Sequence, residues 1–149
     1  MEGAGREVRA RRTRSCYRLF VHLAWHTKRS SRVLTPAARR EMQRFMSDTC
    51  GELQATLLAC DGADDHLHAV VSYPPQLAVT QLAQHLKGAA SHHVNQHTSL
   101  GRVVWQDGYG AFSVSERDLP RVIAYVRSQE QHHADGQPTR ASARVGTEG

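Results

Sequence analysis

The feature of this sequence that most constrains its fold is a hydrophobic period that switches between two residues and three to four residues. From Tyr17 to Trp25, apolar residues alternate with polar ones, which is typical of a strand with one buried face. The Thr35–Pro36 pair then suits the start of a helix, and apolar residues recur after it every three or four positions. The chain is therefore expected to alternate strands and helices.

The same switch continues through the rest of the chain. A turn is expected at residues 61–64, and Ser115 is expected to cap a last helix, with Asp118 as its capping-box partner. The order βαββαβ(β)α predicts an α+β fold, with a ferredoxin-like antiparallel sheet, helices on one face and a further C-terminal helix. The remaining expected elements are strands at 53–60, 66–73, 103–105 and 111–114, and a helix at 79–94.

Length and composition indicate one domain. The 149 residues are 40% hydrophobic and 22% charged, which is enough apolar material for a packed core. Residues 1–15 are basic with almost nothing apolar, and residues 134–149 hold one large apolar residue. Both ends are expected to be disordered tails around a single domain at 16–133.

Charge and cysteine content narrow the setting. A net charge of +5 suits a partner that carries phosphates, although an arginine-rich genome would produce the same excess. No stretch approaches the roughly 20 apolar residues of a membrane helix, so no membrane partner is expected. Cys16, Cys50 and Cys60 form neither a disulfide framework nor a CxxC pair, which favours a reducing cytoplasm.

His66 and His68 form the first candidate site. Side chains two residues apart on a strand share a face, with Cα atoms roughly 6.6 Å apart at about 3.3 Å per residue. Two such imidazoles can hold a divalent metal, although a chain with 10 histidines reaches this spacing easily by chance. Asp64 and Asp65, just before the pair, are either turn residues or carboxylates that orient a histidine.

The last expected helix carries the second candidate pair, Tyr125 and Gln129. At about 100° per residue, Tyr125 lies roughly 110° and Gln129 about 70° from the centre of the apolar stripe, on the same side. Both side chains are therefore expected on one flank, outside the buried row. The stripe itself consists of Leu119, Val122, Ile123 and Val126.

Together these four residues suit the cleavage of a DNA phosphodiester. Attack by Tyr125 would form a phosphotyrosine bond that keeps the bond energy for rejoining, and a divalent cation would stabilise the leaving oxygen. Gln129 could add an oxygen ligand to the two imidazoles, a donor set that suits Mg²⁺ or Mn²⁺. The sequence has no GxxxxGK[ST] loop, so no nucleotide cofactor is expected.

Several segments resemble, in order and spacing, the single-tyrosine HUH transposases. This family comprises the TnpA-type enzymes of small insertion sequences and the REP-associated tyrosine transposases. The resemblance covers about 16–133, and GYGAFSVS and the tyrosine helix are its most diagnostic parts. The segments are VHLAWHTKRS at 21–30, DDHLHAVV at 64–71, LKGAAS at 86–91, WQDGYGAFSVS at 105–115 and VIAYVRSQEQHH at 122–133.

The resemblance implies a role for each candidate residue. His66 and His68 correspond to the metal-binding pair, Tyr125 to the nucleophile and Gln129 to the third metal ligand. The resemblance also implies single-stranded DNA hairpins as partners and a homodimer, in which the tyrosine helix of one subunit can complete the site of the other. Such an enzyme would work in the bacterial cytoplasm, at the nucleoid.

Other residues and functions stay open at this stage. Lys87, Arg121 and Arg127 are candidate DNA-phosphate contacts, with ordinary surface charge as the alternative. The segment after His132 and His133 departs from the family pattern, which puts helix docking and dimerisation in question. The alternatives are a catalytically inactive or domesticated remnant that binds hairpin single-stranded DNA, and an unrelated metalloprotein with a histidine-rich site.

Overall fold

The computed structural model describes residues 15–97 and 102–129. Within them, four strands form one antiparallel sheet in the order β2-β3-β1-β4, which confirms the α+β, ferredoxin-like prediction. The elements are β1 (Phe20–His26), a short 3-10 turn η1 (Lys28–Ser30), α2 (Pro36–Glu52), β2 (Thr56–Gly62), β3 (His66–Ser72), α3 (Val79–His97), β4 (Gly110–Val114) and α4 (Leu119–Arg127).

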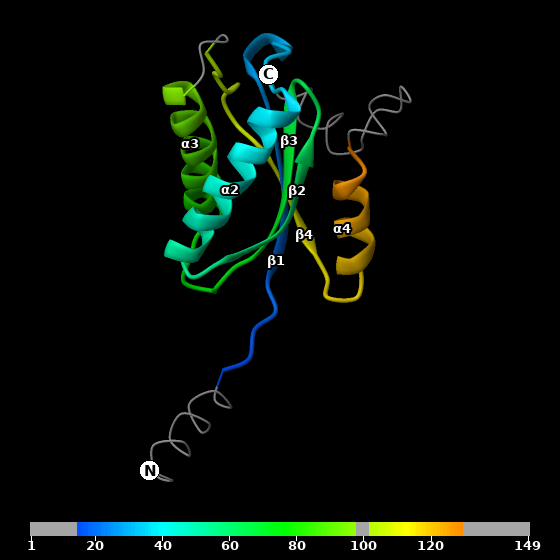
Figure 1. Cartoon of the computed structure of the whole chain (residues 1–149). Helices are drawn as coiled ribbons and strands as arrows, with labels where there is room; N and C mark the ends of the chain where they lie inside the picture. Colours follow the sequence, from blue (N-terminus) through cyan, green and yellow to red (C-terminus); the bar gives the residue numbers. More distant parts are fainter. Residues whose placement is uncertain (1–14, 98–101, 130–149) are drawn as a thin grey trace.

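The two faces of the sheet are covered differently. Helices α2 and α3 lie together on one face, and α4 lies on the other (Figure 1). The α2–α3 face holds the larger apolar core, whereas α4 buries Val126 against Ala59 and Val70. Fully buried residues of the larger core include Leu23, Trp25, Met42, Met46, Leu67, Leu82 and Leu86.

Strand β1 is buried on both faces, so the prediction of a single buried face is wrong. It pairs with β3 on one side and β4 on the other, which puts it inside the sheet. Its polar residue His22 is 7% exposed, because the face that carries it lies under other side chains instead of water. The strand also begins later than expected, at Phe20, and Tyr17 is 52% exposed.

The helix starts were predicted with mixed success. Thr35 caps α2 as expected: its Oγ1 accepts the backbone N–H of Ala38 at 3.1 Å. The Oγ of Ser115 accepts the N–H of Asp118, but this bond closes a turn, and α4 begins only at Leu119. Asp118 makes no side-chain capping bond, so the expected capping box is wrong.

Two other expected elements change. The segment 103–105 is not a sheet strand, because its pairing is limited to one isolated bridge between Trp105 and Thr27, beyond the end of β1. The turn between β2 and β3 is shorter than expected, since β2 continues through Gly62. A side chain at Gly62 would collide with the backbone carbonyl of His66, so the tight hairpin requires glycine there.

Some of the sequence predictions concern residues that the structure does not describe. The expected tails at 1–15 and 134–149 lie outside the described residues, apart from residue 15, as do His132 and His133. None of the described helices is long and apolar enough to cross a bilayer.

Candidate active site

His66 and His68 lie together at the start of β3, as their spacing predicts. Their ring centroids are 5.1 Å apart and the rings are almost perpendicular. Both side chains are buried, while Leu67 between them belongs to the core under α2 and α3. One strand therefore supplies two imidazoles to the face that α4 covers and an apolar anchor to the other face.

Each histidine of the pair has its Nδ1 engaged by a neighbour. His66 Nδ1 lies 2.8 Å from Oδ1 of Asp65, and His68 Nδ1 lies 2.9 Å from Nε2 of His22. A carboxylate accepts, so Nδ1 of His66 donates the hydrogen bond to Asp65. Asp65 thus orients a histidine, which was one of its two possible roles.

Helix α4 brings Tyr125 beside these histidines. Its ring centroid lies 6.4 Å from that of His68 and 6.3 Å from that of His22, edge-on to both. The helix is held in place by Val126, which packs on β2 and β3. The flank of α4 that carries Tyr125 therefore faces the sheet and its histidines.

Gln129 is fully buried, so the prediction that it lies outside the buried row is wrong. Its Nε2 donates to the carbonyl oxygen of Tyr125 at 3.1 Å, as residues four apart on a helix can. Its Oε1 is buried and has no hydrogen-bond partner among the described residues. Tyr125, on the same flank, is half-buried.

The pKa values of His22, His26 and His68 are lowered, so these three imidazoles are neutral near pH 7. Burial lowers the pKa of His22 to about 4, and burial with the neighbouring imidazoles lowers that of His68 well below its usual value. Burial also lowers the pKa of His26, whose ring lies 5.3 Å from that of His66. Neutral imidazole is the form that binds metals.

The donors present fit a small divalent cation. His68 Nε2 and Gln129 Oε1 are both buried without a hydrogen-bond partner in the described part of the chain. Such atoms cost about 1–3 kcal/mol each unless a ligand satisfies them. Within residues 15–97 and 102–129, no group of three His, Cys, Asp or Glu side chains could hold a metal.

Of the predicted DNA-contact residues, Lys87 and Arg121 interact with groups other than the histidines and Tyr125. Lys87 Nζ donates to the carbonyl oxygens of Gln106 and Gly108, both at 3.0 Å, which holds the loop before β4. Arg121 is exposed and lies 3.3 Å from the carboxylate of Asp118, and Arg127 is exposed. A role of these three residues in binding DNA stays a prediction.

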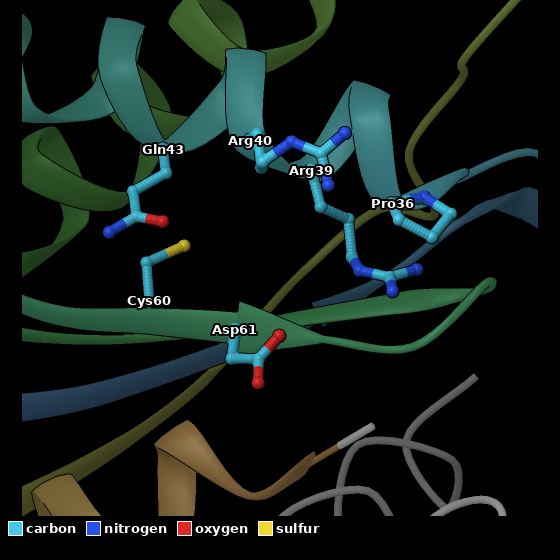
Figure 2. Close-up of a pocket in the computed structure, with 6 residues that line it drawn as sticks. All are labelled: Pro36, Arg39, Arg40, Gln43, Cys60 and Asp61. Carbon is cyan, nitrogen blue, oxygen red and sulfur yellow. The ribbon is translucent and has the colours of Figure 1, made fainter. Parts of the chain in front are cut away.

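A cavity of about 100 Å³ lies between α2 and strand β2 (Figure 2). Burial raises the pKa of the Cys60 thiol to about 12, so this thiol stays protonated and unreactive near neutral pH. The guanidinium of Arg39 donates to the carbonyl of Leu34 at 2.6 Å. The residues that line the cavity are Pro36, Arg39, Arg40, Gln43, Cys60 and Asp61.

Comparison with known proteins decides the family. The family described as transposase IS200 like matches residues 15–129, most of the chain. The chain belongs to the IS200-like transposases. Among curated proteins, this transposase is similar to the ISDra2 transposase TnpA of Deinococcus radiodurans, with 24% identity over 119 residues, 76% of this chain and 85% of that protein.

Solved structures share the fold of this transposase. A crystal structure of a transposase from Deinococcus radiodurans R1 has a TM-score of 0.62 at 23% identity, covering 78% of this chain and 94% of that one. A REP-associated tyrosine transposase bound to a REP hairpin has a TM-score of 0.58 at 13% identity, covering 83% and 74%. The resemblance drawn from the sequence motifs is confirmed.

Sequence reasoning missed the histidines of β1. His22 and His26 have the same parity on the strand as Ala24, which pairs with His68, and His26 pairs with His66. Cross-strand partners share a face, so both β1 histidines lie on the face of the metal pair. The signal was present as polar residues on a strand that the ferredoxin-like order places in the middle of the sheet.

Proposed function

We propose that this transposase cleaves and rejoins single-stranded DNA through a covalent bond to Tyr125, with a divalent cation held by His66, His68 and Gln129. One observation carries the proposal: α4 places the Tyr125 ring beside His68, whose Nε2 is buried without a hydrogen-bond partner in the described chain. Membership of the transposase family supports a DNA substrate.

The chemistry divides between the cation and the chain. A bound Mg²⁺ or Mn²⁺ would polarise the scissile phosphate and stabilise charge on the leaving oxygen. The Tyr125 oxygen loses its proton to solvent and attacks phosphorus, the bond from phosphorus to one sugar oxygen breaks, and that oxygen takes up a proton to leave as a DNA hydroxyl. A DNA hydroxyl later attacks the phosphotyrosine and releases Tyr125, so the number of phosphodiester bonds is conserved without a nucleotide cofactor.

The family and one relative of known structure support the proposed DNA partner. A REP-associated relative binds a REP hairpin, and we propose hairpin single-stranded DNA as the ligand of this chain, within the bacterial nucleoid. A homodimer is part of the proposal. In the described chain α4 lies over its own histidines, held by a small apolar cluster around Val126. A weak hold of this kind would let α4 exchange between subunits.

The deciding experiment is a covalent-adduct assay with the full-length protein. Labelled single-stranded hairpin DNA from the flanks of its own gene is incubated with Mn²⁺ or Mg²⁺ and resolved on a denaturing gel. We expect a metal-dependent adduct that Tyr125→Phe abolishes while hairpin binding persists, because only the nucleophilic oxygen is lost. The exposed Tyr17→Phe serves as the matched control and should keep the adduct.

The other outcomes favour other functions. An adduct that survives in Tyr125→Phe would overturn the assignment of the nucleophile. Hairpin binding without any adduct would favour an inactive or domesticated remnant that binds DNA. Metal binding without affinity for single strands would favour the unrelated metalloprotein.

A further inference from the structure

The bond between His22 and His68 is the least expected contact of the site. Nε2 of His22 lies 2.9 Å from Nδ1 of His68, and both side chains are buried. Two ring nitrogens at this hydrogen-bond distance need a proton between them, so one ring donates and the other accepts. The direction of this bond decides what His68 can do with its second nitrogen.

The two directions have opposite consequences. If His22 donates, His68 carries its proton on Nε2, where a buried N–H meets no acceptor among the described residues. That arrangement costs the desolvation of an unpaired donor and leaves no lone pair for a cation. If His68 donates from Nδ1, its Nε2 lone pair is available, and His22 accepts with its own proton on Nδ1.

We propose that His22 is a positioning residue that accepts the Nδ1 proton of His68 and so holds Nε2 of His68 as a metal ligand. The inference rests on the proposed metal site. The second nitrogen of a metal-binding histidine usually has such a partner, which fixes both ring and tautomer. His22 supplies it from β1, the strand directly paired with β3.

The surroundings of His22 make it a firm and neutral acceptor. Its ring contacts Phe112 of β4 at 5.8 Å and Tyr125 of α4 at 6.3 Å between centroids. Among the described residues, the rings that contact it are an imidazole, a phenyl ring and a phenol. His66 by contrast has the carboxylate of Asp65 as its partner. A neutral acceptor at His68 leaves more of the cation's charge to act on a phosphate.

The first test measures Mn²⁺ affinity of the full-length protein from the free Mn²⁺ signal in electron paramagnetic resonance. His22→Phe keeps a ring but removes the acceptor, and we expect 10- to 100-fold weaker binding. His22→Gln offers an amide oxygen near the same place and should stay within about threefold of wild type. Unchanged affinity in His22→Phe, or equal loss in both variants, would overturn the proposal.

A matched control separates the hydrogen bond from the loss of a neighbouring ring. The ring of His26 lies 5.3 Å from that of His66, and its Nε2 has no hydrogen-bond partner in the described chain. His26→Phe should therefore leave Mn²⁺ affinity within about threefold of wild type. A loss as large as that of His22→Phe would show that any packing change weakens the site.

The second test reads the tautomer directly. Nitrogen-15 NMR of labelled histidine rings, with His68 assigned by its loss in His68→Ala, should show the proton on Nδ1 in the metal-free protein. A proton on Nε2 would overturn the proposal. His68→Ala also distinguishes failure of the proposed metal site from failure of the proposed role of His22. If His68→Ala abolishes Mn²⁺ binding while His22→Phe does not, the metal site stands and only the role of His22 fails. If wild type binds no Mn²⁺, both fail.

Discussion

The two faces of the sheet contrast in what they bury. The face under α2 and α3 buries Leu, Met, Val and Trp side chains in one continuous core. The face under α4 has a smaller apolar cluster of Ala59, Val70 and Val126, with the buried His22, His66, His68 and Gln129 nearby. Since apolar burial dominates folding free energy, the first face supplies most of the stability. The second can hold polar groups whose burial would otherwise be costly.

Strand β3 shows the contrast within three residues. His66 and His68 point to the face of α4, and Leu67 between them joins the larger core. Neighbouring residues of β3 therefore have different roles: the histidines belong to the candidate site, and Leu67 belongs to the apolar core. Substitutions at these positions test the contrast between the two faces most directly, because the three residues lie on the same strand and are all buried.

The largest effect is expected from His68→Ala. If His68 holds the proposed cation, its loss removes several kcal/mol of charge stabilisation, and cleavage should fall on the order of a thousandfold. Mn²⁺ binding should be lost as well. Single-turnover cleavage and Mn²⁺ titration measure the two effects. If His68→Ala instead lowers stability while the molecules that remain folded still bind Mn²⁺, His68 serves the stability of the fold and the contrast between the two faces is wrong.

Leu67→Ala should do the reverse. Removing a fully buried leucine from a packed core lowers the free energy of unfolding by about 2–5 kcal/mol. Urea denaturation measures this loss. Mn²⁺ affinity of the molecules that remain folded should change less than twofold, because Leu67 points away from the site. A selective loss of affinity with unchanged stability would show that the faces are not separate.

Arg121→Ala is expected to have the smallest effect on stability. Its pair with Asp118 is exposed, so unfolding free energy should change by less than about 0.5 kcal/mol. If Arg121 contacts phosphate, the slope of log affinity for hairpin DNA against log salt should fall by about one. The equally exposed Arg44 of α2, on the opposite face of the sheet, is the control, and Arg44→Ala should leave that slope unchanged.

The order of the secondary-structure elements was easier to predict from the sequence than the polar side chains that surround the site. Periodicity gave the order of elements, and the spacing of His66 and His68 gave their shared face, because local geometry alone determines it. Burial of Gln129 could not be predicted, since it depends on how α4 packs on the sheet. His22 was missed for a related reason: its partner is 46 residues away, and pairing of β1 with β3 decides that they meet.

The register of β1 against β3 determines whether the histidines of the two strands meet. Phe20 to His26 pair with Ser72 to His66 without a break. A slip by one residue would turn His22 toward the apolar core and separate it from His68. The proposed cation site therefore requires the correct pairing of β1 with β3, and a misregistered sheet should lose the Mn²⁺ binding that we propose.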